Sequence, residues 1–328
     1  MADVGKAIQG YINEILRLSR DDISTAVKSR EWILDRIQTA ISNQVEDIKL
    51  YRPSPRVHFG SYFKGTKVST VDEFDVLFVL DSKGITHSTT KFSGSGLGST
   101  TPNPLSSYII RGSSAISSIQ VLNWLQRIAQ DVVSSFSGQA PQRNGQAIEV
   151  IIQSRDLKID LVPALIFERT PWGQTFYAIP KGDPQGNWIS TSPRVDIEQL
   201  QTVASGKANF RNVIRLMKRI KDTHNFQVSS FAIETAIVTY GSQNSWSGDL
   251  YMEVCGMLLY MQDVFRRGVI YDPFDSGVNL LTGVQNSGRY AERLRRIVDQ
   301  LMDWQRQSIY TIDQATLNLK LKILFENG

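Results

Sequence analysis

The chain has 328 residues, of which 41% are hydrophobic and 21% charged, a composition typical of a folded globular protein large enough for two lobes. Thirty-six basic and 32 acidic residues give a net charge of +4, which permits nucleotide or nucleic-acid binding without indicating it. The single cysteine, Cys255, excludes an internal disulfide and a cysteine-rich zinc site. The N-terminus lacks a signal pattern and no apolar run approaches the roughly 20 residues that span a bilayer, so we expect a soluble cytoplasmic protein without a membrane partner.

Residues 5–47 have the apolar spacing of two successive helical segments. The apolar positions are Ile8, Ile12, Ile15, Leu16 and Leu18 in the first segment and Ile33, Ile37, Ile41 and Val45 in the second. Pro53 and Pro55 end this pattern, and a short strand is predicted to follow at residues 56–59.

An acidic strand is predicted at residues 73–80 (EFDVLFVL), after a Gly60-Ser61 pair. Because side chains alternate along a strand, Glu73 and Asp75 project from one face and the apolar residues beside them from the other. Adjacent carboxylates repel each other unless a cation lies between them, and Mg²⁺ prefers carboxylate, phosphate and water oxygens. Gly60 and Ser61 offer backbone N–H groups and a hydroxyl to a phosphate, particularly if a helix begins there. The pattern favours metal-assisted chemistry on a nucleoside triphosphate, and the alternative is an exposed acidic strand edge.

The segment 82–118 is rich in Ser, Thr and Gly (for example FSGSGLGSTTPNPLSS). Such a composition buries too little surface to offset its ordering entropy, so we expect most of it to be mobile. A long insertion beside an active site is either a lid or a passive loop, and the sequence leaves both open.

A helix is predicted at residues 119–136, followed by strands at 147–153 and 157–165 joined by a hairpin at 154–156. The second strand places Asp160 inside an apolar run, where an unpaired charge is costly. If Asp160 lies beside Glu73 and Asp75 as a third carboxylate of the same site, the presence of a charge in this apolar run is explained.

Three convergent carboxylates can hold two Mg²⁺ ions about 3.5–4 Å apart, an arrangement that serves phosphoryl transfer. The alternative for Asp160 is a buried ion pair with Lys158 or Arg155.

From Asn209 onward the sequence is mostly helical, and we take this shift in composition as the start of a second lobe. Helices are predicted from residue 210, after a cap at Ser229-Ser230, at 251–265 and at 289–305. A basic surface is also present, and either a solvated face or an RNA-binding surface explains it: Lys207, Arg211, Arg215, Arg219, Lys221, Arg293, Arg295 and Arg296.

Seven segments in this order resemble one family. They are GSYFKGT (60–66), EFD (73–75), KIDLVPAL (158–165), IPKGDPQGNWISTSP (179–193), FRNVIRLMKRIK (210–221), SSFAIETA (229–236) and VIYDPFDSGVNLLTG (269–283). Together they resemble the cGAS/DncV-like nucleotidyltransferases, which include the bacterial CD-NTases, animal cyclic GMP-AMP synthase and its relatives, and the oligoadenylate synthases. The cysteine-rich zinc insertion of the vertebrate enzyme is absent.

The resemblance implies an α+β fold: a Pol β-like mixed-sheet nucleotidyltransferase core with a long N-terminal spine helix, and a C-terminal helical lobe that closes a cleft. The implied domains are residues 1–205, with the insertion at 82–118, and residues 206–328. The implied activity is the Mg²⁺-dependent joining of nucleoside triphosphates, ATP among them, into a cyclic di- or oligonucleotide second messenger. Pyrophosphate would be released, and the implied role is antiviral or anti-phage immune signalling.

By the same resemblance, the catalytic and metal-binding residues would be Glu73, Asp75 and Asp160, holding two Mg²⁺ ions, with Mn²⁺ as an alternative. The implied nucleotide-binding residues are Gly60, Ser61, Lys218, Ser230 and Phe231. Lys218 would bind phosphate, with Lys221 as a substitute, although a solvated basic helix face is the alternative. Phe231 would stack on a base, or belong to the core. His58 is better explained by strand packing than by catalysis.

Other activities remain open on the same fold. A linear 2′–5′ oligoadenylate synthase or an RNA nucleotidyltransferase would use the same acids, and an inactive scaffold would not require them. The partners we expect are ATP and other nucleoside triphosphates, with an activating nucleic acid or regulatory protein as a further candidate. We expect a monomer.

Overall fold

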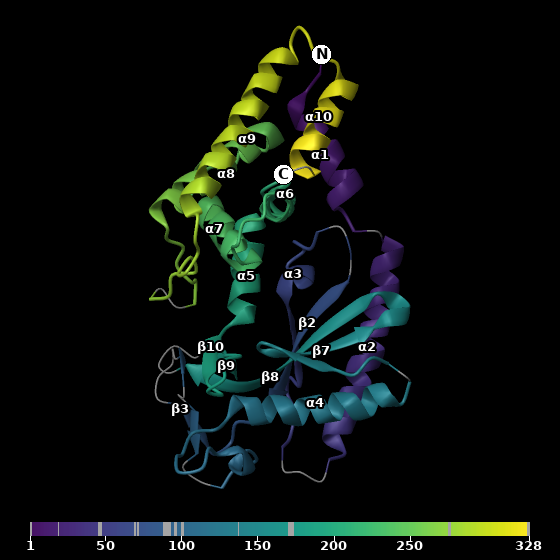
Figure 1. Cartoon of the computed structure of the whole chain (residues 1–328), viewed down its shortest axis with the longest axis vertical. Coiled ribbons are helices and arrows are strands. Elements are labelled where there is room, and N and C mark those ends of the chain that lie inside the picture. Colours follow the sequence, from purple (N-terminus) through teal and green to yellow (C-terminus); the bar gives the residue numbers. More distant parts are fainter. Residues whose placement is uncertain are drawn as a thin grey trace. The chain divides into compact units, whose positions relative to one another are not determined.

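The computed structural model describes residues 2–18, 20–44, 48–68, 70, 72–87, 93–94, 97–99, 102–136, 138–169, 174–274 and 277–326 (Figure 1). The chain divides into two compact units. Unit 1 consists of Met1–Leu18, Lys64–Thr70 and Val195–Gly328, and unit 2 of Ser19–Phe63 and Val71–Arg194. No helix in the described part of the chain is both long and apolar enough to cross a membrane.

The described residues of unit 2 form a mixed eight-stranded sheet. Its strands β2 (Glu73–Leu80) and β8 (Leu157–Arg169) pair in parallel. Antiparallel neighbours are β1 (Arg56–Phe59) beside β2, and β7 (Ala147–Ile152) and β9 (Gln174–Pro180) along β8. The sheet is completed by β6 (Gln142–Asn144), β10 (Trp188–Thr191) and β4 (Ser93–Gly94). The predicted hairpin is present: β7 and β8 join through a 3₁₀ turn, Gln153–Arg155, and Asp156 at φ 47°.

Helix α2 (Arg20–Ser42) reaches the apolar face of β2 through Arg30. The guanidinium of the buried Arg30 lies 4.5 Å from the ring centroid of Phe74, which is fully buried. Helix α4 (Ser118–Ser134) contacts α2, β7 and β8, and Ser117 caps it by accepting a hydrogen bond from the Gln120 N–H. Since successive side chains of a strand alternate, Glu73 and Asp75 point away from α2.

The described parts of the 82–118 segment carry more structure than its composition predicts. Strands β3 (Ile85–His87) and β5 (Leu97–Ser99) pair, β4 joins β10, and a 3₁₀ turn spans Ser106–Tyr108. Leu97, Leu105 and Ile116 are buried, and these scattered apolar residues account for the difference. Residues 88–92, 95–96 and 100–101 of this segment lie outside the described residues.

The described residues of unit 1 are mostly helical, as predicted for the C-terminal part of the chain. Its helices are α1 (Val4–Tyr11) with a π-helical turn (Ile12–Leu16), α5 (Pro193–Ala204), α6 (Phe210–Thr223), α7 (Ser230–Gln243), α8 (Leu250–Arg267), α9 (Ser287–Gln307) and α10 (Gln314–Glu326). They bury one continuous apolar cluster. The mixed sheet with its helices and this helical part confirm the predicted fold class.

The two compact units do not coincide with the predicted domains 1–205 and 206–328, because unit 1 also includes Met1–Leu18 and Lys64–Thr70 and begins its last segment at Val195. The helical N-terminal region is interrupted at Arg17, whose ψ of 142° is extended, so that α1 belongs to unit 1 and α2 to unit 2. Helix α1 contacts α8 and α10, which lie far from it in the sequence, and its residue Ile8 is buried in the same apolar cluster. Composition alone does not reveal such non-local packing, and Val45 of the predicted second segment lies outside the described residues.

The segment 64–70 belongs to unit 1 and is bound by one face of α6. Arg211 Nε donates to the Lys64 carbonyl (3.0 Å), and Arg215 Nε donates to the Lys67 carbonyl (3.1 Å). Lys218 Nζ donates to the carbonyl and hydroxyl oxygens of Thr66, both at 3.2 Å. Arg211 and Arg215 are therefore not simply solvated, because each binds a neighbouring backbone carbonyl through its Nε.

A buried carboxylate on α7 completes this network. Glu234 is 4% exposed and accepts hydrogen bonds from Lys64 Nζ (2.8 Å) and Thr66 Oγ1 (2.5 Å). It also pairs with Lys218, while Lys64 has a second partner in Asp196. Burial disfavours the charged carboxylate, but the two lysines hold the pKa of Glu234 below its ordinary value.

Replacing Glu234 by Gln should destabilise the protein by about 3–5 kcal/mol, because it leaves two buried ammonium groups short of a counter-charge. Denaturant unfolding measures this loss. Glu253→Gln is the matched control: Glu253 is equally buried but bonds Ser247 and Gly248 rather than lysines, so its loss should be smaller. Equal losses would contradict the importance of the lysine network.

Candidate active site

The three predicted acids converge on one face of the sheet of unit 2. In the parallel ladder Asp75 is the partner of Asp160, and Glu73 is the partner of Lys158. Each acid offers a carboxylate oxygen, and these oxygens all lie within 4.8 Å of one another. The expected meeting of residues distant in sequence is therefore present, while their catalytic roles stay predictions.

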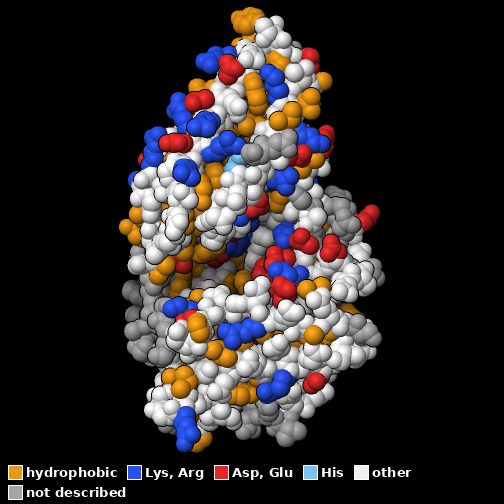
Figure 2. All heavy atoms as spheres, viewed as in Figure 1, with side chains coloured by type: hydrophobic (Ala, Val, Ile, Leu, Met, Phe, Trp, Pro, Cys, Tyr) orange, Lys and Arg blue, Asp and Glu red, His pale blue; other side chains and the backbone are white. Residues whose placement is uncertain are grey.

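A lysine and a fourth acid accompany the triad. Lys158 Nζ lies 2.5 Å from Glu73 Oε1, 3.4 Å from Glu149 Oε2 and 3.5 Å from Asp160 Oδ2. Glu149 comes from β7, where it is the antiparallel partner of Asp160. The ion pair between Asp160 and Lys158 that the sequence offers as an alternative thus exists together with the acid cluster. A cluster of this composition, acidic side chains around a basic one, is visible on the surface in Figure 2.

The electrostatics of this cluster favour a cation. Burial, opposed by Lys158 and reinforced by Glu73 and Glu149, raises the pKa of Asp160 to about 6. Burial also disfavours the charge of Lys158, yet the surrounding carboxylates hold the pKa of this lysine above its ordinary value. Glu73, Glu149 and Asp160 thus share one ammonium, with Asp75 beside them, and a further cation can relieve the repulsion among these carboxylates.

The donor set fits a hard divalent metal. All three triad ligands are carboxylates, the oxygen donors that such ions prefer. Asp160 Oδ1 is buried and has no hydrogen-bond partner among the described residues, so it has a lone pair available for a ligand. Glu73, Asp75 and Asp160 could therefore hold a metal ion.

Gly60 packs directly against the acid cluster. It has a φ of +78°, and a Cβ at this position would overlap the Asp75 carboxylate, lying 2.8 Å from its Cγ. Glycine is thus required both by the backbone conformation and by the proximity of Asp75. The short helix α3 (Gly60–Phe63) begins here, as the phosphate-binding interpretation of Gly60 and Ser61 anticipates, and Ser61 is partly exposed.

The other predicted nucleotide-binding residues lie in unit 1. Lys218 is 4% exposed and bonded to Glu234 and Thr66, so the prediction of a solvated helix face is wrong for this side chain. Ser230 is exposed at the start of α7, although the capping residue is Ser229. Phe231 is partly buried, with Lys64 Nζ 5.2 Å from its ring centroid. Their contacts with a nucleotide stay predictions.

Sequence reasoning missed Glu149, Lys64 and Glu234. Glu149 could have been found by pairing the predicted hairpin, because it then falls opposite Asp160. Glu234 is a charge between apolar residues of one helix, the same signal that identified Asp160. His58 packs on Phe63, with ring centroids 4.7 Å apart, which confirms its packing role.

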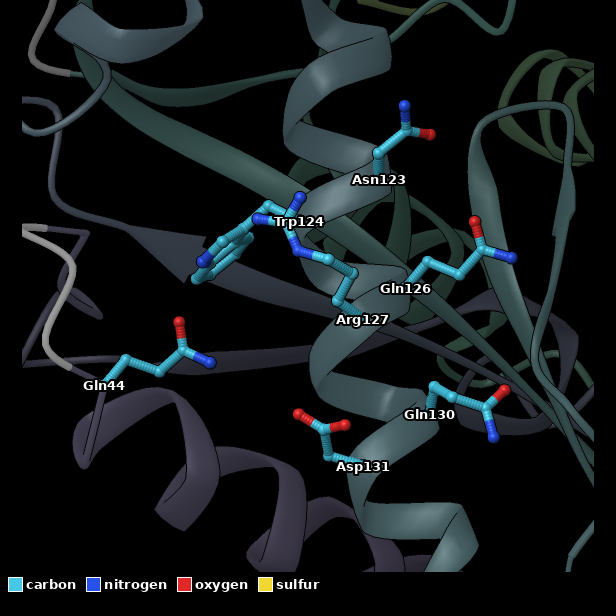
Figure 3. Close-up of a pocket in the computed structure, with 7 residues that line it drawn as sticks. All are labelled: Gln44, Asn123, Trp124, Gln126, Arg127, Gln130 and Asp131. Atoms are coloured by element: carbon cyan, nitrogen blue, oxygen red, sulfur yellow. The ribbon is translucent and has the colours of Figure 1, made fainter.

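A separate cavity of about 480 Å³ lies against α4 in unit 2 (Figure 3). Side-chain amides line most of it, together with Trp124, Arg127 and Asp131, and Gln44 beyond the end of α2 faces α4 across it. None of the triad residues lines this cavity, so it gives no alternative location for the predicted chemistry.

Comparison with protein families and curated proteins gives consistent matches. Residues 62–191 match the Mab-21 protein nucleotidyltransferase domain. A probable cyclic nucleotide synthase of Bacillus cereus is 23% identical over 81% of this chain and 80% of its own length. The cyclic GMP-AMP synthase of Sus scrofa is 22% identical, and a cyclic GMP-AMP synthase-like protein of Drosophila melanogaster is 27% identical. The match to the Sus scrofa protein covers 57% of this chain and 38% of the relative's length, and the match to the Drosophila protein covers 36% and 39%.

The fold also matches a solved structure, that of Escherichia coli MS115-1 CdnC with ATP. The TM-score is 0.69 at 15% sequence identity, and the match covers 99% of this chain and 98% of CdnC. This likeness establishes the fold.

Replacing Lys158 by Met should strengthen divalent-cation binding and destabilise the metal-free protein, because Glu73, Glu149 and Asp160 lose the ammonium group that they share. In EDTA we expect a lower melting temperature than in the unsubstituted protein, and on addition of Mn²⁺ a larger upward shift. Lys181→Met, which removes a more exposed lysine paired with Asp183, is the control. An unchanged Mn²⁺ response in Lys158→Met would show that Lys158 does not compete for this site.

Proposed function

We propose that the chain, which resembles the cGAS/DncV-like nucleotidyltransferases, joins nucleoside triphosphates, ATP among them, into a cyclic di- or oligonucleotide with release of pyrophosphate. The observation that carries this proposal is the convergence of Glu73, Asp75 and Asp160 in register on β2 and β8. The similarity to a probable cyclic nucleotide synthase and to cyclic GMP-AMP synthase supports a cyclic product, and the ATP in the CdnC structure supports nucleotides as substrates.

In this proposal Glu73, Asp75 and Asp160 hold Mg²⁺, with two ions per site and Mn²⁺ as an alternative. When bound, the ions neutralise charge on the reacting phosphate. Asp160, supplied by a different strand from the other two acids, accepts a hydrogen bond from the attacking ribose hydroxyl and favours its deprotonation. Gly60 and Ser61 donate hydrogen bonds to the β- and γ-phosphates.

Unit 1 contributes the remaining nucleotide contacts in this proposal. Lys218 supplies positive charge for the phosphates, and its bonds to Glu234 and Thr66 restrict its position. Ser230 donates a hydrogen bond at the exposed start of α7, and Phe231 stacks on a base. A monomer regulated by a nucleic acid or protein partner, in antiviral or anti-phage defence, completes the proposal.

Incubation with labelled ATP, GTP, CTP and UTP in Mg²⁺, followed by phosphatase, tests the reaction. A labelled product that resists phosphatase is expected, because a cyclic nucleotide has no terminal phosphate. A sensitive product would indicate a linear oligonucleotide instead, and no product from any substrate combination would contradict synthesis by the chain alone.

Asp75→Asn should abolish this product without unfolding the protein, while Asp81→Asn, just beyond the opposite end of β2, should retain it. Synthesis retained by Asp75→Asn would refute the site assignment.

A further inference from the structure

Unit 1 contains a pocket that shares no residue with the proposed active site. It has a volume of about 340 Å³ and is lined by residues of α9 and α10, with His224 from the end of α6. Small-molecule sites begin at about this size. Its lining combines three cationic side chains with an aromatic and aliphatic wall, and each part has a distinct consequence for binding.

The cations are Arg293 and Arg296 on α9 and Lys320 on α10. In the described part of the chain none of them has a carboxylate at ion-pair distance, whereas two neighbouring arginines on α9 do: Arg295 pairs with Asp299 and Arg306 with Asp303. The pocket therefore concentrates positive charge that no ion pair among the described residues neutralises. Such a pocket attracts an anion.

Arg293 is oriented by a neutral histidine. Its Nε donates a hydrogen bond to His224 Nδ1 at 3.0 Å, so that the imidazole carries its proton on Nε2. Burial and the adjacent Arg293 lower the pKa of His224 to about 4, and the imidazole accordingly stays neutral near pH 7. This bond uses only Nε of the guanidinium and leaves its two terminal nitrogens for a ligand, as in forked recognition of phosphate.

The remaining wall is apolar. Trp304 is partly buried, with Lys320 Nζ 5.8 Å from its ring centroid, and Ile297 and Ile323 line the same pocket. Ile323 is 49% exposed, so its side chain is accessible to a ligand in the pocket. An indole beside cations can take a planar ring while the cations hold a phosphate.

We propose that this pocket is a separate binding site for a mononucleotide, with the phosphate on Arg293, Arg296 and Lys320 and the base against Trp304. The apolar wall favours a nucleotide over inorganic phosphate, which would leave it uncovered. A long nucleic acid fits less well, because Asp and Glu side chains interrupt the basic residues along α9, as Figure 2 shows. This site goes beyond the proposed synthesis and does not depend on it.

Binding of N-methylanthraniloyl-AMP to the full chain in EDTA, followed by fluorescence anisotropy, tests the proposal. EDTA removes metal-dependent binding at the acid cluster. We expect saturable binding that weakens roughly ten-fold or more in the double variant Arg296→Gln/Lys320→Gln, since each lost charge-assisted hydrogen bond contributes at least this much. Arg295→Gln/Lys322→Gln, which removes two charges from the same helices outside the pocket, should change the affinity less than about two-fold.

Two further comparisons identify what is bound. Trp304→Leu should weaken binding of the labelled AMP but leave competition by inorganic phosphate unchanged if the indole contacts the base. Phe231→Ala, which removes the base contact proposed for the active site, should bind the labelled AMP as the unsubstituted protein does, and this result separates the two sites. Equal loss in both double variants, or binding that depends on Phe231 and not on Arg296 and Lys320, would overturn the proposal.

Discussion

Repulsion among carboxylates is the constraint on which the rest of unit 2 depends. Parallel pairing of β2 with β8 places Asp75 beside Asp160, and antiparallel pairing with β7 adds Glu149. An arrangement of this kind is unstable unless positive charge is supplied. Lys158 supplies part of it from within the chain, and the buried Oδ1 of Asp160, which has no hydrogen-bond partner among the described residues, can accept a further cation. Gly60 is held to a glycine by the same cluster, because any side chain there would meet Asp75.

In unit 1 the charges are reversed: buried lysines are stabilised by a carboxylate placed between them. Lys64 and Lys218 both pair with Glu234, and Thr66 donates to the same carboxylate. Between Ser61 and Glu73, both of which belong to unit 2, the segment Lys64–Thr70 belongs to unit 1. The predicted phosphate-binding turn is therefore linked along the chain to the acids by a segment that α6 binds. Residues that are neighbours in the sequence therefore belong to different units here, so the position of a residue in the sequence does not reveal its unit.

Charges inside apolar runs were the most informative part of the sequence. Asp160 was predicted to join Glu73 and Asp75 because an isolated carboxylate on a buried strand needs a partner, and the structure brings the three together. Residues whose partners come from remote elements could not be found in this way. The contact of Gly60 with Asp75, the packing of α1 on α8 and α10, and the bonds of Arg211 and Arg215 to the 64–67 backbone all depend on non-local geometry. The helices and strands with clear periodicity were predicted, whereas α5, α10, β9 and β10 were not.

Anomalous diffraction from crystals of the full chain soaked in Mn²⁺ would reveal whether the acids of β2 and β8 form a metal site. We expect an anomalous peak bound by oxygens of Glu73, Asp75 and Asp160, with Lys158 displaced from at least one of its carboxylates. A saturating Mn²⁺ soak that leaves Lys158 among the carboxylates, with no peak beside them, would contradict it.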